Sequence, residues 1–259
     1  MVVTTQQAPP DTFFDCIFNG VHLFLPSITL SIMRNCIYGK LDDQLLVHVE
    51  SAHMEWLRDK LRTGDTFLDV GAATGAMTLP ISKWRRQIKV IAFEPNRTAN
   101  RVLRQTIERN AIECVEVLDY AVTDACGVAS FIQYEHDATG GTPWLSEASS
   151  LFTPESAPKH LSVAGIYEVP TITLDSFFNQ RRDAASVRSV KIDVEGFEVQ
   201  VLRGALGFLD QVRPFIAIDI HKDPFGDQMT EDGVRACLDS IGYRFEKMYH
   251  VLLCCPGPA

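Results

Sequence analysis

Short apolar runs alternate along the chain with longer segments in which apolar residues recur every three or four positions. A fully apolar run is typical of a strand buried on both faces, and helical spacing between such runs is typical of crossover helices. The pattern predicts an α/β fold, with a mostly parallel sheet and helices on both of its faces. The predicted strands are residues 66–69, 90–93, 115–118, 189–194, 214–220, 243–247 and 249–253, and predicted helices include residues 97–110, 199–206 and 230–241.

The beginning of the chain has a different pattern, and residues 1–62 are predicted to be an N-terminal extension of a main domain at residues 63–259. The polar, proline-containing start of the extension indicates a loose tail. Residues 21–25 alternate in the way a short strand does. Residues 42–62 have apolar positions close to helical spacing, which predicts a helix that covers one edge of the domain.

Regular periodicity is lost between residues 135 and 168, directly after a predicted strand at residues 128–134. This stretch contains Gly140, Gly141, three prolines and many serines. A loop of this length inside a compact domain is usually functional or disordered. The sequence is consistent with a lid that faces the substrate, and a solvated insertion remains the alternative.

Charge and cysteine content narrow the classes of partner and compartment. The formal net charge of −9 argues against a nucleic-acid or anionic-membrane partner, because both reward a basic surface. The seven cysteines form no C-x-x-C pair, so they indicate neither a zinc knuckle nor a disulfide framework. We find no signal-peptide pattern and no apolar run long enough for a membrane span. A cytoplasmic location is therefore expected.

The first βα turn carries the clearest chemical signal. The strand at residues 66–69 ends in Asp69, and a turn bracketed by two glycines follows it. The next strand ends in Glu94 and Pro95, and this carboxylate is placed to receive two ribose hydroxyls. The turn lacks the third glycine of a pyrophosphate-binding loop, which favours S-adenosylmethionine over a nicotinamide or flavin cofactor. The turn residues are Gly71, Ala72, Ala73, Thr74 and Gly75.

Two other classes remain open at this point, namely a nucleotide-dependent oxidoreductase and a structural βα turn in some other α/β protein. Because ligands bind at the carboxyl ends of parallel strands, the polar residues that follow each strand are expected to meet at one edge. The loop after the third strand lies next to the base of a bound ligand in such a sheet. The ionisable residues expected at this edge are Asp69, Glu94, Asp119, Asp193, Glu195, Asp219 and His221.

Six motifs in order resemble the FkbM family of S-adenosylmethionine-dependent methyltransferases: DVGAATG, AFEPN, LDYAVTD, TLDSF, VKIDVEGFEVQVLRGA and RPFIAIDIH. The resemblance covers roughly residues 65–221, and KIDVEGFE followed by LRGA is its most specific part. It implies a class I methyltransferase fold, Rossmann-like, whose seven-stranded sheet has a reversed last strand. Two departures stand out, since the family commonly has Asn in place of Ala73 and Glu in place of Asp219.

The expected positions of these residues at the strand ends, and the chemistry of methyl transfer, give individual residues hypothetical roles. The cofactor is expected to contact Asp69, the turn from Gly71 to Gly75, Glu94, Pro95, Asp119, Tyr120, Ala121 and Asp193. We expect Asp193 to position the reactants, Glu195 to bind the acceptor and His221 to remove its proton. A Mg²⁺ ion held by Asp193, Glu195 and Asp219 is an open alternative, because hard cations bind clustered carboxylates.

The implied reaction is O-methylation of a small hydroxylated molecule, such as a sugar or a polyketide-type natural product. N-methylation of a small amine and a binding module without turnover are the remaining alternatives. The expected partners are therefore small molecules rather than nucleic acid or membrane, and a homodimer is left open. The sequence does not identify the methyl acceptor.

Overall fold

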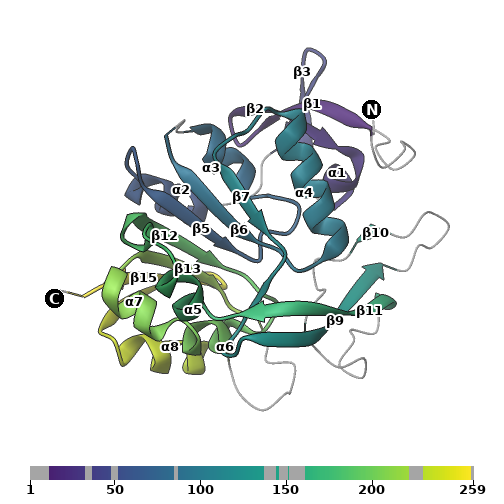
Figure 1. The fold of residues 1–259 in the computed structure, drawn as a ribbon. Coiled ribbons are helices and arrows are strands. Elements are labelled where there is room, and N and C mark those ends of the chain that lie inside the picture. The colour runs from purple at the N-terminus through teal and green to yellow at the C-terminus, as the bar shows by residue number, and fades with distance from the viewer. Residues whose placement is uncertain are drawn as a thin grey trace.

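The computed structural model describes residues 12–32, 37–47, 52–84, 87–136, 144–145, 151, 161–221 and 230–257. A seven-stranded sheet forms the centre of the molecule (Figure 1). All of its neighbouring strands are parallel except at β15, which runs opposite to both neighbours. The predicted sheet with a reversed last strand is thus confirmed. In sheet order, the strands are β14 (Tyr243–Met248), β15 (Val251–Pro256), β13 (Phe215–Asp219), β12 (Val187–Ile192), β5 (Thr66–Val70), β6 (Lys89–Phe93) and β7 (Val115–Leu118).

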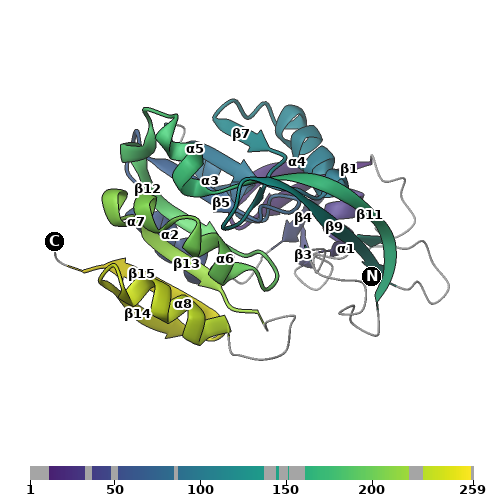
Figure 2. The same cartoon turned by 60° about the horizontal axis from the view of Figure 1, so that its bottom comes forward.

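Helices cover both faces of this sheet, as the apolar runs predict. On one face lie α2 (Ala52–Lys60), α3 (Thr78–Trp84) and α4 (Arg97–Arg109), and on the other lie α5 (Leu174–Asn179), α6 (Glu198–Arg203), α7 (Leu206–Val212) and α8 (Thr230–Asp239) (Figure 2). Successive residues of β6 face opposite layers: Ile91 packs with α5 to α8, and Ala92 packs with α3 and α4. No helix in the described part of the chain is long and apolar enough to cross a membrane.

The N-terminal region is a second sheet rather than a single strand and a helix. The predicted strand at residues 21–25 is confirmed as β2 (Val21–Pro26), which pairs with β1 (Phe13–Phe18) and precedes the short helix α1 (Ser27–Ile32). The hairpin of β3 (Ile37–Leu41) and β4 (Gln44–Val47) completes the sheet in the order β2-β1-β4-β3.

The prediction of one helix over residues 42–62 is wrong in its first part. Gln44–Val47 is strand β4, and the described helix begins only at Ala52. Leu45 and Val47 are buried, whereas Gln44 and Leu46 are partly exposed, which is the two-residue period of a strand. Asp42 adopts a left-handed conformation in the turn before it, with φ of 53°. The apolar residues at positions 45–47 fit a helical period as well as a strand period. The pairing of β4 with β1 and β3 shows that the segment is a strand.

A third sheet stands beside the central one and corrects the expectation for residues 135–168. Its strands are β10 (Trp144–Leu145), β9 (Gly127–His136), β11 (Leu161–Ile172) and β8 (Ala121–Val122), in that order. β9 and β11 pair antiparallel from Leu161–His136 to Thr171–Gly127, so both ends of the stretch without periodicity belong to strands. Figure 2 shows this pair as a long curved arm. The glycine pair at 140–141 and Phe152 lie outside the described residues, and the lid stays a prediction.

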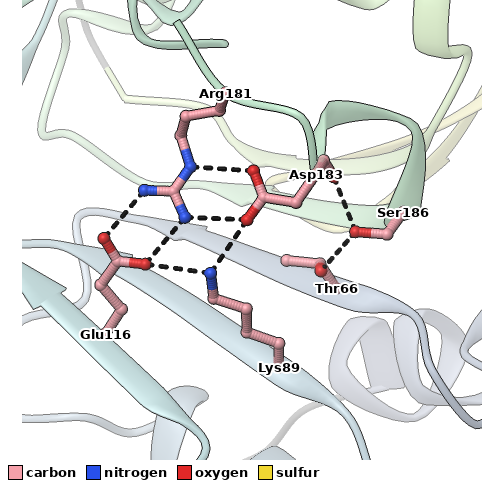
Figure 3. Close-up of polar contacts among 6 residues, drawn as sticks. All are labelled: Thr66, Lys89, Glu116, Arg181, Asp183 and Ser186. Atoms are coloured by element: carbon pink, nitrogen blue, oxygen red, sulfur yellow. Dashed lines mark hydrogen bonds and ion pairs between the residues drawn. The ribbon is translucent and has the colours of Figure 1, made fainter.

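An ion-pair cluster closes the amino-terminal edge of the central sheet (Figure 3). The guanidinium of Arg181 donates to both carboxylate oxygens of Glu116, at 2.9 Å each, and to both oxygens of Asp183, at 2.9 and 2.8 Å. The ammonium of Lys89 lies 2.9 Å from Asp183 and 3.1 Å from Glu116. Hydrogen bonds from Arg181 lower the pKa of both carboxyl groups. The cluster therefore joins β6, β7 and the loop after α5.

Hydroxyl groups extend this connection to the first strand. Ser186 ends a short 3₁₀ helix, η4 (Ala184–Ser186), and donates to the carbonyl oxygen of Asp183 at 2.7 Å. Its hydroxyl also lies 2.8 Å from that of Thr66 at the start of β5 (Figure 3). The loop that leads into β12 is thus fixed at the edge opposite the carboxyl ends of the strands.

Replacing Arg181 with glutamine is expected to lower the free energy of unfolding by about 1 kcal/mol at pH 7, because the charges are partly exposed. Both carboxyl groups have a lowered pKa in the folded state, so their contribution is present above the unfolded pKa of about 4 and is lost as pH falls further. Urea denaturation should therefore show that the difference in free energy of unfolding between the wild type and Arg181→Gln becomes smaller as the pH falls below about 4. The exposed neighbour Arg182 provides the control variant, Arg182→Gln, which should show no such loss.

Candidate active site

The glycine turn is packed directly against the end of the neighbouring strand β12. Gly71 has φ of +81°, and a Cβ atom there would lie 1.8 Å from the carbonyl oxygen of Asp193. Only glycine allows both the left-handed backbone and this close approach. Gly75 has φ of +100°, and its missing Cβ makes room for the side chains of Leu79 and Leu103. The second glycine therefore serves the packing of α3 and α4 against the turn.

Glu94 holds the tip of the turn in place from the end of β6. Its Oε2 accepts a 2.6 Å hydrogen bond from the amide of Ala73, and its Oε1 accepts one of 2.7 Å from the amide of Asn96. Burial raises the pKa of this carboxyl to about 7, although the two amide bonds act in the other direction. Each oxygen keeps a second lone pair for a ligand hydroxyl. Ala73 is itself left-handed, with φ of 48°, a conformation that Asn tolerates better.

Asp69 and Lys191 form a buried charge pair between β5 and β12. Asp69 is fully buried, and its Oδ2 accepts a 2.6 Å hydrogen bond from the hydroxyl of Thr78. Its Oδ1 has no hydrogen-bond partner among the described residues and lies 3.6 Å from Nζ of Lys191. Lys191 donates to the carbonyl oxygen of Gly71 at 2.6 Å and lies 3.0 Å from Oδ2 of Asp193. Lys191 therefore connects the glycine turn at residues 71–75 with Asp193 at the carboxyl end of β12.

His221 lies within a group of three carboxylates at the carboxyl ends of β12 and β13. Its Nδ1 is 2.9 Å from Oε1 of Glu198, and its Nε2 is 3.6 Å from Glu195 and 3.7 Å from Asp193. Burial lowers the pKa of His221, but the hydrogen bond with Glu198 and the nearby carboxylates outweigh it and raise the pKa to about 10. The imidazole of His221 is thus protonated on both nitrogens, and positively charged, at neutral pH. Its predicted role as a base remains a prediction.

Two further histidines that the sequence analysis did not select lie near this group. Nε2 of His250, in the turn between β14 and β15, is 3.5 Å from Oδ2 of Asp219. His53, near the start of α2, has a pKa lowered to about 4 by burial and by the positive charge of Lys191. Neither histidine belongs to a motif in the sequence. Only the sheet order, which places β15 beside β13, brings His250 to this edge.

The residues expected near the adenine lie in three different environments. Asp119 is exposed and, together with Pro95, lines a groove of about 340 Å³ beside α4. Tyr120 is half-buried against the core that includes α5 to α8, and Ala121 is buried in β8. Asp119 is thus an exposed polar residue of the loop after β7 that borders this groove.

The sequence-predicted metal ligands are only partly brought together. Donor atoms of Asp193, Asp219 and His221 lie within 4.8 Å of one another, and Glu195 is not part of this group. Mg²⁺ prefers oxygen ligands, whereas this group includes an imidazole nitrogen, and the ammonium of Lys191 already lies 3.0 Å from Asp193. The geometry is therefore a poor fit for Mg²⁺, and we derive no step through a metal ion.

A family model described as the methyltransferase FkbM domain matches residues 69–245. The chain belongs to the FkbM methyltransferase family. The match begins at Asp69 and ends within β14, so it contains the glycine turn and the carboxyl ends of all parallel strands described above. Methyl transfer is the activity of this family, and the resemblance noted in the motifs is confirmed.

A solved methyltransferase structure shares the fold of this FkbM domain at low sequence identity, and other solved structures match it with TM-scores below 0.5. A methyltransferase FkbM from Methylobacillus flagellatus has a TM-score of 0.50 at 15% identity, and the match covers 76% of this chain and 45% of that one. An rRNA methylase from Streptococcus thermophilus has a TM-score of 0.45 at 12% identity, with coverage of 80% and 95%. The chain thus spans less than half the length of the Methylobacillus protein. A search of curated proteins found no match.

Replacing Gly71 with alanine is expected to lower the free energy of unfolding by more than about 2 kcal/mol, because the new Cβ adds a clash to the cost of a left-handed backbone. Thermal or urea denaturation measures the loss. Gly20→Ala is the matched control, since Gly20 has a similar φ of +78° and a Cβ added there would meet no atom within 4 Å. It should cost about 1 kcal/mol. Equal losses in the two variants would contradict the contact with Asp193.

Proposed function

We propose that this FkbM domain transfers a methyl group from S-adenosylmethionine to a hydroxyl of a small molecule, with a sugar or a polyketide-type natural product as acceptor. The observation that carries the proposal is Oδ1 of Asp69, a fully buried carboxylate oxygen without a hydrogen-bond partner among the described residues. The ammonium of Lys191 lies 3.6 Å away and balances its charge without a hydrogen bond, and an ammonium group of a ligand would supply that bond. The buried hydroxyl of Thr74, in the same turn, also has no described partner.

The remaining cofactor contacts follow from the positions of the strand ends. Glu94 presents its free lone pairs at the end of β6, where the two hydroxyls of a ribose fit. Asp119 and Pro95 border the groove next to it, where the base would extend. The cofactor supplies an activated methyl group on a sulfonium, so the protein must mainly align the acceptor oxygen with that carbon.

The acceptor is assigned to the space bordered by Asp193, Glu195 and His221. An alcohol needs a proton acceptor within hydrogen-bond reach as its oxygen bonds to the methyl carbon. Glu195 and His221 are the two candidates, and their side chains lie 3.6 Å apart. Asp193 is held at 3.0 Å by Lys191, which suits it to a fixed, positioning role.

A direct test uses S-adenosylmethionine with a radiolabelled methyl group and a panel of sugars, hydroxylated polyketides and small amines. The proposal requires transfer to a hydroxyl. Transfer to an amine would establish the N-methylation alternative, and binding without transfer to any probe would indicate a binding module. Running the assay with EDTA and with added Mg²⁺ decides the metal alternative, and we expect the same rate in both.

Glu94→Ala is expected to weaken binding of S-adenosylhomocysteine at least about tenfold, because it removes charge-assisted hydrogen bonds and the anchor of the turn. Isothermal titration calorimetry measures the change. Glu113→Ala is the control, since Glu113 is exposed and lies just before β7, at the edge of the sheet opposite the proposed cofactor site. Unchanged affinity in Glu94→Ala would remove this residue from the cofactor site.

His221→Asn is expected to lower kcat at least about tenfold at pH 7 while the affinity for S-adenosylhomocysteine stays within about twofold. The pH profile of the wild type assigns the proton acceptor. A histidine base with a pKa of about 10 becomes active only as pH rises toward that value. A carboxylate base is already ionised at pH 7, so kcat would be near its plateau there. Full activity of the variant would end the role of His221.

A further inference from the structure

Glu198 is a completely buried carboxylate whose only described polar partners belong to the acceptor site. It is the first residue of α6 and has no exposed surface. Its Oε1 lies 2.9 Å from Nδ1 of His221 and accepts a hydrogen bond of 3.0 Å from the amide of Gly196. A carboxylate is rarely fully buried unless it is paired, because burial costs it the hydration of its charge.

The bond to Nδ1 determines how the imidazole of His221 is presented. With its Nδ1 proton donated to Glu198, the ring cannot turn over without breaking a charge-assisted hydrogen bond. Nε2 is thereby directed at the carboxylates of Glu195 and Asp193, at 3.6 and 3.7 Å. A carboxylate behind a histidine fixes the tautomer and the orientation of the ring in the same way in other sites.

The hydrogen bond between Glu198 and the amide of Gly196 fixes the backbone next to Glu195. Glu195 and Gly196 both have left-handed backbones, with φ of 55° and 100°. Such a conformation is costly for Glu195 and persists only when its surroundings hold it. Because one oxygen of Glu198 binds both the Gly196 amide and His221, it sets the position of Glu195 relative to the imidazole. These two groups come from the ends of different strands, β12 and β13.

We propose that Glu198 is the positioning residue of the acceptor site, which holds His221 and Glu195 in register for the transfer of the acceptor's proton. This inference rests on the proposed methyl transfer. Glu198 does not reach the reactants, since it is buried behind the imidazole. It acts through the orientation of His221.

The test compares Glu198→Gln and Glu198→Leu with the wild type. Glutamine keeps a carbonyl oxygen that can accept both hydrogen bonds but removes the charge, whereas leucine removes both contacts. With histidine labelled in ¹⁵N and S-adenosylhomocysteine bound, NMR should show a slowly exchanging Nδ1 proton on His221 in the wild type. We expect this proton to exchange faster in Glu198→Gln and its signal to be lost in Glu198→Leu, and we expect kcat to fall about 10- to 100-fold in both variants with KM for S-adenosylmethionine unchanged.

Asp175→Asn is the matched control. Asp175 accepts hydrogen bonds from the amides of Gly207 and Phe208 at the start of α7 and has no described contact with the acceptor site. This variant should lower the melting temperature but leave the His221 signal and kcat unchanged. A purely structural Glu198 would behave in the same way, and an unchanged His221 proton signal in Glu198→Leu would overturn the proposal.

The two arms separate this inference from the proposed function. The kinetic arm uses the hydroxylated probe that accepts most label in the methyl-transfer assay. If the wild type methylates no probe, the proposed function fails, and the NMR arm still decides whether Glu198 orients His221. If transfer occurs and Glu198→Gln retains full kcat, only the positioning role fails.

Discussion

The structure depends on one buried ammonium group, that of Lys191. It lies between the carboxyl ends of the neighbouring strands β5 and β12. It is within 3.0 Å of Asp193 and 3.6 Å of Asp69, and it donates to the carbonyl oxygen of Gly71. Burial acts to lower its pKa, but the two carboxylates outweigh this effect and raise it. The lysine therefore keeps its charge in the interior. Without it, the fully buried carboxylate of Asp69 would lose its compensating charge, at a cost of several kcal/mol.

The contacts of Lys191 explain why the glycine turn at residues 71–75 and the carboxyl end of β12 form one unit. The parallel pairing of β5 and β12 places Lys191 opposite Asp69, so a side chain from one strand reaches the turn that ends the other. The turn can close onto β12 only because Gly71 has no Cβ. At the opposite edge of the sheet, the ion-pair cluster around Arg181 joins β6 and β7 to the loop between α5 and β12. The amino-terminal edge of the sheet is thus stabilised by ion pairs, and the carboxyl-terminal edge holds the proposed active site.

The central sheet and the cofactor turn were predictable, because they follow from local pattern. The buried parallel strands are mostly apolar and so stand out in the sequence, and the position of Glu94 at the end of its strand follows from strand order alone. The residues that complete the site were not predictable in this way. Lys191 reads as a surface residue until pairing with β5 buries it, and Glu198 reads as a favourable charge at a helix start. β4 was missed because a four-residue strand fits a helical period as well, and only its pairing with β1 decides.

The charges of the site are consistent with the needs of methyl transfer. The positive charge of a sulfonium is lost during the reaction, so a site that stabilised this charge strongly would favour the reactant over the transition state. Asp69 and Asp193 lie at the strand ends where we propose that the cofactor binds, and two carboxylates without a balancing charge there would have that effect. Lys191 offsets them, and the protonated imidazole of His221 offsets Glu195 and Glu198. The protein can therefore hold the cofactor by its ammonium and ribose groups, as proposed, without overstabilising the sulfur that must lose its charge.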